Sequence, residues 1–297
     1  MIDVPEALGW WAAREGGPEW LARLPRLAAE CAERWSLRLG EPFPDGHVSL
    51  CLPAERNDGA RVVLKINFPE EETEREGDAL ELWNGEGAVR LLGYDRTRRA
   101  LLLERCEPGT QLWAVADDEE ATRIAAGVLR RLWRAPPPDH AFRPLEREVD
   151  RWARELPRDW EALGRPFERD LVDAAVDFMR GAGTDQGEQV VLHQDFHGGN
   201  VLLSERAGWL AIDPKPLVGE REFDAASLLR DRRWLLRGTG FEEIVRRRVE
   251  VLEEELALDR DRLRGWGIAH ALAWGISPET QKLHADHVEC ARLLLRA

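Results

Sequence analysis

Hydrophobic and polar positions divide the chain into a strand-rich first part and a helical second part. Apolar residues three and four positions apart predict helices, and short apolar runs bounded by Gly, Pro or Asp predict strands. Asp58-Gly59, between two such runs, is a typical hairpin turn. In the first part the pattern predicts a helix over 6–39, strands over 48–52 and 61–67, a charged helix over 73–83, and strands over 89–94 and 100–104.

The second part is mainly helical, with three short apolar runs embedded in it. These runs, over 190–192, 201–203 and 209–212, predict strands. Helices are expected over 117–133, 145–156, 169–180, 224–236, 241–256 and 260–274. Strands and helices are thus segregated, which indicates an α+β fold and not alternating βαβ units. The predicted domains are an N-terminal lobe over 1–107 and a helical C-terminal lobe over 108–297.

Charge and composition exclude several classes of protein. The chain carries 56 acidic and 42 basic side chains, a net charge of −14, which disfavours sequence-independent binding to nucleic acid. No window is apolar enough for a membrane span, and the N-terminus lacks the pattern of a signal peptide. The four cysteines lie far apart, as expected for reduced thiols. We therefore expect a cytoplasmic protein with no nucleic-acid or membrane partner.

The segment from His193 to Asn200, followed by Asp213, carries the most chemical information. It reads H-x-D-x-x-x-x-N with Asp195 at its centre, and Asp213 ends the next predicted hairpin. Phosphoryl transfer from a nucleotide needs a carboxylate beside the attacking hydroxyl and oxygen ligands for Mg²⁺. Asp and Asn are also common in turns, but their combined spacing favours a site.

Lys65 is a second candidate, because it lies inside an otherwise apolar strand. A lysine there must reach solvent or find a partner. The favoured partner is Glu76 in the following helix, with Glu72 as the alternative. Two structural interpretations compete: Thr73-x-x-Glu76 fits a helix capping box, and edge strands often carry lysine.

The order of these residues resembles the protein-kinase-like fold. Within that fold, several short sequence segments are similar to those of the aminoglycoside phosphotransferase family, in its streptomycin 6-kinase and hydroxyurea phosphotransferase branch. They are clearest at 210–215, 218–220 and 222–224, and the resemblance covers roughly residues 35–235. It implies a two-lobed α+β protein with a small antiparallel-sheet N-lobe and a larger helical C-lobe. Gln194 departs from the glycine usual between the His and Asp of antibiotic kinases.

The resemblance also implies a role for each candidate residue. Asp195 would be the catalytic base that orients the acceptor hydroxyl. Asn200 and Asp213 would bind Mg²⁺, and Lys65, aligned by Glu76, would contact the phosphates of ATP.

Further residues of the nucleotide site follow from the same resemblance. The turn around Gly46, over 45–47, would cover the phosphates, although it lacks a G-x-G-x-x-G pattern. The segment from Glu104 to Cys106 would bind the adenine edge through its backbone. His193 is interpreted as a structural brace, and Asp224 as a helix N-cap.

The acceptor is expected to be a small, cationic, polyhydroxylated molecule such as streptomycin. The C-terminal helices are rich in carboxylates and tryptophans that suit such a ligand, including Trp234, Glu253–Glu255 and Trp274. The charge run at 253–255 also fits a solvated helix face, and Trp266, His270 and Trp274 share a face that could line a pocket or a core. The alternatives are a kinase for hydroxyurea or another metabolite, and a nucleotide-binding protein without catalysis.

Overall fold

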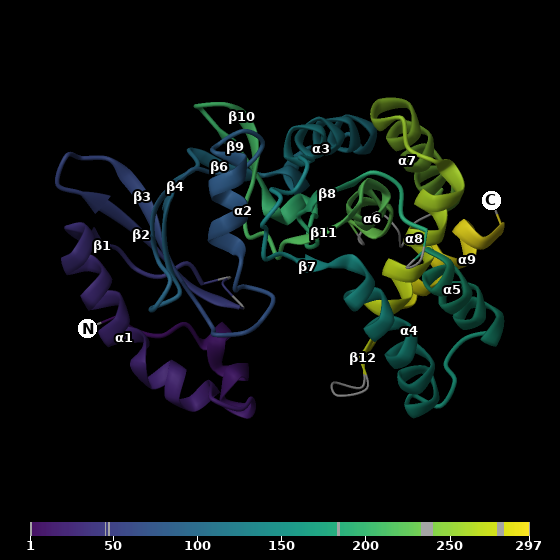
Figure 1. Cartoon of the computed structure of the whole chain (residues 1–297), viewed down its shortest axis with the longest axis horizontal. Helices are drawn as coiled ribbons and strands as arrows, with labels where there is room; N and C mark the ends of the chain where they lie inside the picture. The colour runs from purple at the N-terminus through teal and green to yellow at the C-terminus, as the bar shows by residue number, and fades with distance from the viewer. Residues whose placement is uncertain are drawn as a thin grey trace. The chain divides into compact units, whose positions relative to one another are not determined.

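The computed structural model describes residues 2–44, 46, 48–182, 185–232, 240–277 and 282–296. The chain forms two compact units, Met1–Gly109 and Thr110–Ala297, and Figure 1 labels most of their helices and strands. The division lies close to the boundary that the sequence predicts after residue 107. Within the described ranges no helix has the length and apolar character needed to cross a bilayer.

The first unit is built on one antiparallel five-stranded sheet in the order β1-β2-β3-β5-β4. Its strands are β1 (Leu37–Leu39), β2 (Ser49–Arg56), β3 (Arg61–Asn67), β4 (Leu91–Asp95) and β5 (Ala100–Glu104). All four predicted strands are present, and β3 and β5 have the predicted bounds. The sheet matches the antiparallel N-lobe that the resemblance implies.

The helix predicted over 6–39 is three separate elements. They are the 3₁₀ helix η1 (Glu6–Ala13), the α-helix α1 (Gly17–Trp35) and the edge strand β1. The breaks come at left-handed backbone positions, Gly16 with φ 73° and Ser36 with φ 54°, where a helix cannot continue. The charged helix is shorter than predicted, since α2 spans Glu76–Trp83.

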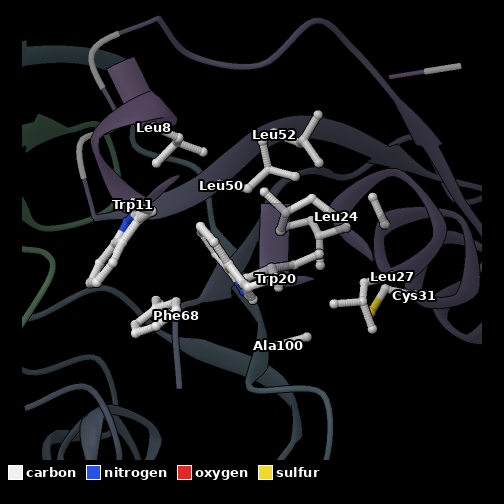
Figure 2. Close-up of a cluster of buried hydrophobic side chains, with 13 residues drawn as sticks. Leu8, Trp11, Trp20, Leu24, Leu27, Cys31, Leu50, Leu52, Phe68 and Ala100 are labelled. Carbon is white, nitrogen blue, oxygen red and sulfur yellow. The ribbon is translucent and has the colours of Figure 1, made fainter. Parts of the chain in front are cut away.

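Alternation along β3 gives the sheet two different faces. Leu64 and Ile66 belong to a buried hydrophobic cluster with α1. Figure 2 shows this cluster, in which Trp20 and Leu24 of α1 lie near Leu50 of β2. Lys65, between the two apolar residues, faces the opposite side, where Glu76 of α2 meets it. The strand therefore presents its lysine away from the main core of this unit.

The second unit consists mainly of helices. They are α3 (Asp118–Leu132), α4 (Leu145–Ala162), α5 (Arg169–Ala182), α6 (Arg221–Ala226), α7 (Phe241–Leu256), α8 (Arg260–Ala273) and α9 (Ala285–Arg296), with 3₁₀ turns η2 (Leu112–Ala114), η3 (Gly198–Asn200) and η4 (Ser227–Arg230). In Figure 1, α8 lies among α5, α6 and α9, and these helices pack against it.

Among the residues that the structure describes, three small sheets accompany these helices. Their orders are β10-β9-β6, β7-β11-β8 and β12-β13. The strands are β6 (Pro108–Gln111), β7 (Arg143–Pro144), β8 (Gln189–Leu192), β9 (Val201–Ser204), β10 (Gly208–Ala211), β11 (Leu217–Glu220), β12 (Ile276–Ser277) and β13 (Lys282–Leu283). The predicted strands correspond to β8, β9 and β10, so the H-x-D-x-x-x-x-N segment joins two strands.

Two predicted helices of the second unit differ from the structure by more than two residues at one end at least. The segment predicted as one helix over 224–236 contains α6, which begins earlier at Arg221, and then η4; residues 233–239 lie outside the described ranges. Helix α4 continues through Pro157, where the sequence predicted an end. Trp160, one turn later, is buried and donates its indole N–H to Phe167 O at 3.0 Å. This packing outweighs the backbone hydrogen bond lost at the proline.

Candidate functional site

The loop from His193 to Asn200 leaves β8 through a strained backbone position. Gln194 has φ 68°, in the left-handed region that favours glycine. This explains why glycine suits the position in which the sequence has glutamine. The Gln194 amide is buried, and Arg143 Nη2 donates to its Oε1 at 3.2 Å. Strained residues of this kind are typical of functional loops.

Asp224 holds the start of this loop. Its two carboxylate oxygens accept the backbone N–H groups of His193 and Gln194, each at 2.8 Å. Trp133 Nε1 lies 3.4 Å from the same carboxylate. Asp224 is fully buried, and this burial raises the pKa of its carboxyl to about 6. The prediction of a helix N-cap is wrong, since α6 begins after Glu220 and Asp224 lies inside it.

His193 braces the loop against the next segment. Its Nε2 lies 2.9 Å from Ile212 O, and burial lowers the pKa of the imidazole to about 4. The ring is therefore neutral at physiological pH and donates from Nε2. The Lys215 N–H donates to His193 O at 3.0 Å, which ties the two segments together a second time. This geometry agrees with a structural brace.

Asn200 and Asp213, the metal-ligand candidates, are linked through the backbone. The N–H of Ile212 donates to Asn200 O at 2.9 Å, and Asp213 follows with φ 58°. The Asn200 side chain donates its Nδ2 to Asp195 O at 3.0 Å. The amide oxygen Oδ1 of Asn200 therefore points away from Asp195 O and can act as a cation ligand. Among the described residues, no three His, Cys, Asp or Glu side chains form a metal cluster. The donors fit Mg²⁺, which takes one or two protein ligands and completes its shell with phosphates and water.

Asp195, the predicted base, is paired with Lys215. Lys215 Nζ lies 2.6 Å from Asp195 Oδ2, and His197 Nε2 lies 3.8 Å from Oδ1. Burial raises the pKa of the Asp195 carboxyl, but Lys215 and His197 lower it more, so it stays below the ordinary value. Asp195 is therefore ionised at neutral pH and able to accept a hydroxyl proton.

The far end of the loop is fixed by Asp231. Its carboxylate accepts the N–H of Gly198 at 2.7 Å and the indole N–H of Trp113 at 2.9 Å. The Trp113 ring stacks on His197 with a centroid distance of 5.2 Å. A Cβ added at Gly198 or Gly199 would lie within 2.8 Å of the Trp113 side chain. Both glycines are therefore required by this packing.

In the first unit, Lys65 and Glu76 form a buried ion pair. Their Nζ and Oε1 atoms are 2.6 Å apart, and Asn67 Nδ2 donates to the other oxygen, Oε2, at 2.7 Å. The pair selects Glu76 over the alternative Glu72. The hydroxyl of Thr73 donates to Phe68 O at 2.9 Å, so both side chains of the supposed capping box have other partners.

The remaining nucleotide-site candidates lie in the same unit. A Cβ at Gly46 would come within 2.9 Å of Ser49 O, so the turn there is tight; residues 45 and 47 lie outside the described ranges. Glu104 ends β5, and its N–H donates to Arg90 O at 3.0 Å. Cys106 is buried two residues later. Their predicted roles stay predictions.

The acceptor-site candidates of the C-terminal helices separate into core and surface. Trp266 and His270 of α8 are fully buried, whereas Trp274, which caps the C-terminal end of this helix, is 40% exposed. The run Glu253–Glu255 forms surface ion pairs with arginines, Glu253 with Arg260, Glu254 with Arg123, and Glu255 with Arg123 and Arg130. The run is therefore a solvated helix face, the alternative that the sequence left open. Trp234 lies outside the described ranges.

Three contacts of the loop did not emerge from the sequence. They are made by Lys215, Asp231 and Trp113. Lys215 follows the candidate Asp213 closely, so its position near the site was visible but its partner was not. Asp231 and Trp113 lie far from the loop along the chain and carried no local signal.

Comparison with known proteins gives consistent results. Residues 34–278 match the family described as aminoglycoside/hydroxyurea antibiotic resistance kinase. The chain is 38% identical to the streptomycin 6-kinase of Streptomyces glaucescens, over 99% of this chain and 97% of that one. It is 33% identical to the hydroxyurea phosphotransferase of Kitasatospora aureofaciens, over 99% of this chain and 86% of the relative.

Solved structures share the fold. A thermostable mutant of the aminoglycoside phosphotransferase APH(4)-Ia, in a ternary complex with AMP-PNP and hygromycin B, superposes with a TM-score of 0.60. The match covers 92% of this chain and 97% of that chain at 14% sequence identity. The predicted two-lobed protein-kinase-like fold is therefore confirmed.

Proposed function

Because the chain belongs to the aminoglycoside/hydroxyurea antibiotic resistance kinases, it is a small-molecule kinase, and we propose that it phosphorylates a hydroxyl group of an aminoglycoside such as streptomycin. The observation that carries this proposal is the loop in which ionised Asp195 lies beside Asn200, which is linked in turn to Asp213. Phosphoryl transfer depends on positioning and charge neutralisation more than on covalent chemistry.

In this reaction Asp195 takes the proton of the acceptor hydroxyl as the hydroxyl oxygen attacks the terminal phosphorus of ATP. The bond from that phosphorus to the bridging oxygen breaks, and ADP leaves with the electron pair. Asn200 and Asp213 would hold Mg²⁺, which would neutralise phosphate charge. Lys65, aligned by Glu76, would contact the α- and β-phosphates.

The rest of the nucleotide site belongs to the same proposal. The turn at Gly46 would cover the phosphates, and the backbone from Glu104 to Cys106 would bind the adenine edge. The structural neighbour that holds AMP-PNP and hygromycin B supports a nucleotide and an aminoglycoside as ligands.

The nature of the acceptor follows from charge and from the relatives. The net charge of −14 favours a cationic, polyhydroxylated small molecule and disfavours nucleic acid. The streptomycin 6-kinase relative supports streptomycin. Hydroxyurea is the second candidate, because a hydroxyurea phosphotransferase matches almost the whole chain. We further propose that the protein acts in the cytoplasm without a membrane partner.

Incubation with MgATP and a panel of acceptors tests the function. The panel contains streptomycin, a second aminoglycoside, hydroxyurea and a neutral sugar, and mass spectrometry detects a single added phosphate. We expect streptomycin to be modified. Modification of hydroxyurea or the sugar alone would reject the aminoglycoside and retain the kinase, whereas no modified acceptor would favour a nucleotide-binding protein without catalysis.

The Asp213→Ala variant is expected to bind ATP with an affinity that no longer depends on Mg²⁺, because it lacks a proposed metal ligand. Lys65→Ala is the matched comparison. It should weaken ATP binding about 10- to 100-fold while the Mg²⁺ dependence persists, since bonds to charged groups contribute about 1.5–3 kcal/mol. Calorimetric titration with and without Mg²⁺ separates the two effects. An unchanged Mg²⁺ dependence in Asp213→Ala would reject the metal assignment.

A further inference from the structure

Lysine is rare in this chain. Of the 42 lysine and arginine residues only three are lysine, at positions 65, 215 and 282. The structure describes two of their side chains, and both are buried, Lys65 with 4% and Lys215 with 6% of its surface exposed. Each lies 2.6 Å from a carboxylate oxygen. Lys65 belongs to the proposed nucleotide site, whereas Lys215 has no part in the function proposed above. Burying an ammonium group costs free energy unless the charge is paired. The presence of a buried lysine at position 215 therefore needs an explanation.

The backbone around Lys215 is stiff. It stands between Pro214 and Pro216, whose rings fix φ, and both prolines are buried. Its own N–H donates to His193 O at 3.0 Å. The Cα and Cβ atoms of Lys215 are therefore held at a fixed position relative to the loop that carries Asp195.

The two oxygens of Asp195 have different surroundings. Oδ2 faces Lys215 Nζ at 2.6 Å and Asn200 Nδ2 at 3.5 Å. Within the described part of the chain, the polar contact recorded for Oδ1 is His197 Nε2 at 3.8 Å, beyond hydrogen-bond distance. The lysine thus occupies one oxygen and fixes the carboxylate plane, and the second oxygen keeps its capacity to accept a proton.

We propose that Lys215 is a positioning residue for phosphoryl transfer, which holds Asp195 Oδ2 so that Oδ1 takes the proton of the acceptor hydroxyl. This inference rests on the proposed function, because it concerns the same base. A competing explanation is that Lys215 only neutralises a buried charge. In that case its loss changes the stability of the protein and leaves turnover per folded molecule unchanged.

Lys215→Met is the principal test, because methionine has a similar length and no charge. We expect kcat to fall about 100-fold, as a displacement of about 1 Å costs a reacting group roughly this factor. The KM for ATP should stay unchanged, since Lys215 acts on the base. Lys215→Arg should keep more turnover than Lys215→Met, because it restores the charge with a different geometry. Thermal unfolding of each variant reports the folded fraction.

A double variant separates positioning from a purely structural role. If Lys215 acts through Asp195, Asp195→Asn combined with Lys215→Met should turn over no slower than Asp195→Asn alone. The double variant also removes both charges, so it remains a test if Lys215→Met alone folds poorly. Wild-type kcat in Lys215→Met, or losses that multiply in the double variant, would overturn the inference. If the wild-type chain phosphorylates no acceptor, the proposed function itself fails and the inference fails with it.

Discussion

The Asp195→Asn variant is expected to bind MgATP almost normally and to lose about 10²- to 10⁴-fold in turnover, the usual contribution of a general base. The amide has the shape of the carboxylate but cannot accept the hydroxyl proton. The metal-ligand candidate Asn200 should stay in place, because its Nδ2 donates to the backbone oxygen of residue 195, which the substitution keeps. Calorimetry measures ATP binding, and steady-state phosphorylation of the acceptor measures turnover.

Asp261→Asn provides the matched control for this change. The Asp261 side chain is 92% exposed in the first turn of α8 and contacts Arg264 at 3.6 Å, so its substitution should leave turnover unaltered. A comparable loss in both variants would indicate a general effect on the protein. Wild-type turnover in Asp195→Asn would remove Asp195 from the mechanism.

Elements with strong local signals could be predicted from the sequence residue by residue. The strands Arg61–Asn67 and Ala100–Glu104 and the helix Phe241–Leu256 have the predicted bounds. The first of these strands has a clear local marker in the sequence, because the Asp58-Gly59 turn precedes it. The pairing of Lys65 with Glu76 was also predictable. Glu76 lies only 11 positions after the lysine, in the helix that directly follows its strand.

Elements that depend on distant partners could not be predicted in the same way. The strand β11 (Leu217–Glu220) is buried between β7 and β8, and its Gly and Glu give no strand signal of their own. Asp224 lies 31 positions from the His193 N–H that it accepts, and Lys215 lies 20 positions from Asp195. Such contacts depend on the tertiary fold, which local patterns do not encode. The candidate residues were therefore visible in the sequence, whereas the residues that hold them in place were not.

The Asp224→Ala variant is expected to lose both stability and turnover, because two buried backbone donors lose their acceptor. Each unsatisfied N–H costs about 1–3 kcal/mol, so the free energy of unfolding of the second unit should fall by roughly 2–6 kcal/mol. The N–H groups of His193 and Gln194 define the start of the loop. Gln194 is held at a positive φ, and without its acceptor the strained backbone is free to relax. Turnover should therefore fall even in the fraction that remains folded.

Asp224→Asn is the graded comparison, since its amide keeps one acceptor oxygen and can satisfy one of the two N–H groups. The stability and the turnover of Asp224→Asn should both lie between those of the wild type and those of Asp224→Ala. Urea unfolding measures stability, and hydrogen exchange at the amides of His193 and Gln194 measures whether the loop start has opened. Exchange that stays as slow in Asp224→Ala as in the wild type would show that Asp224 does not hold the loop.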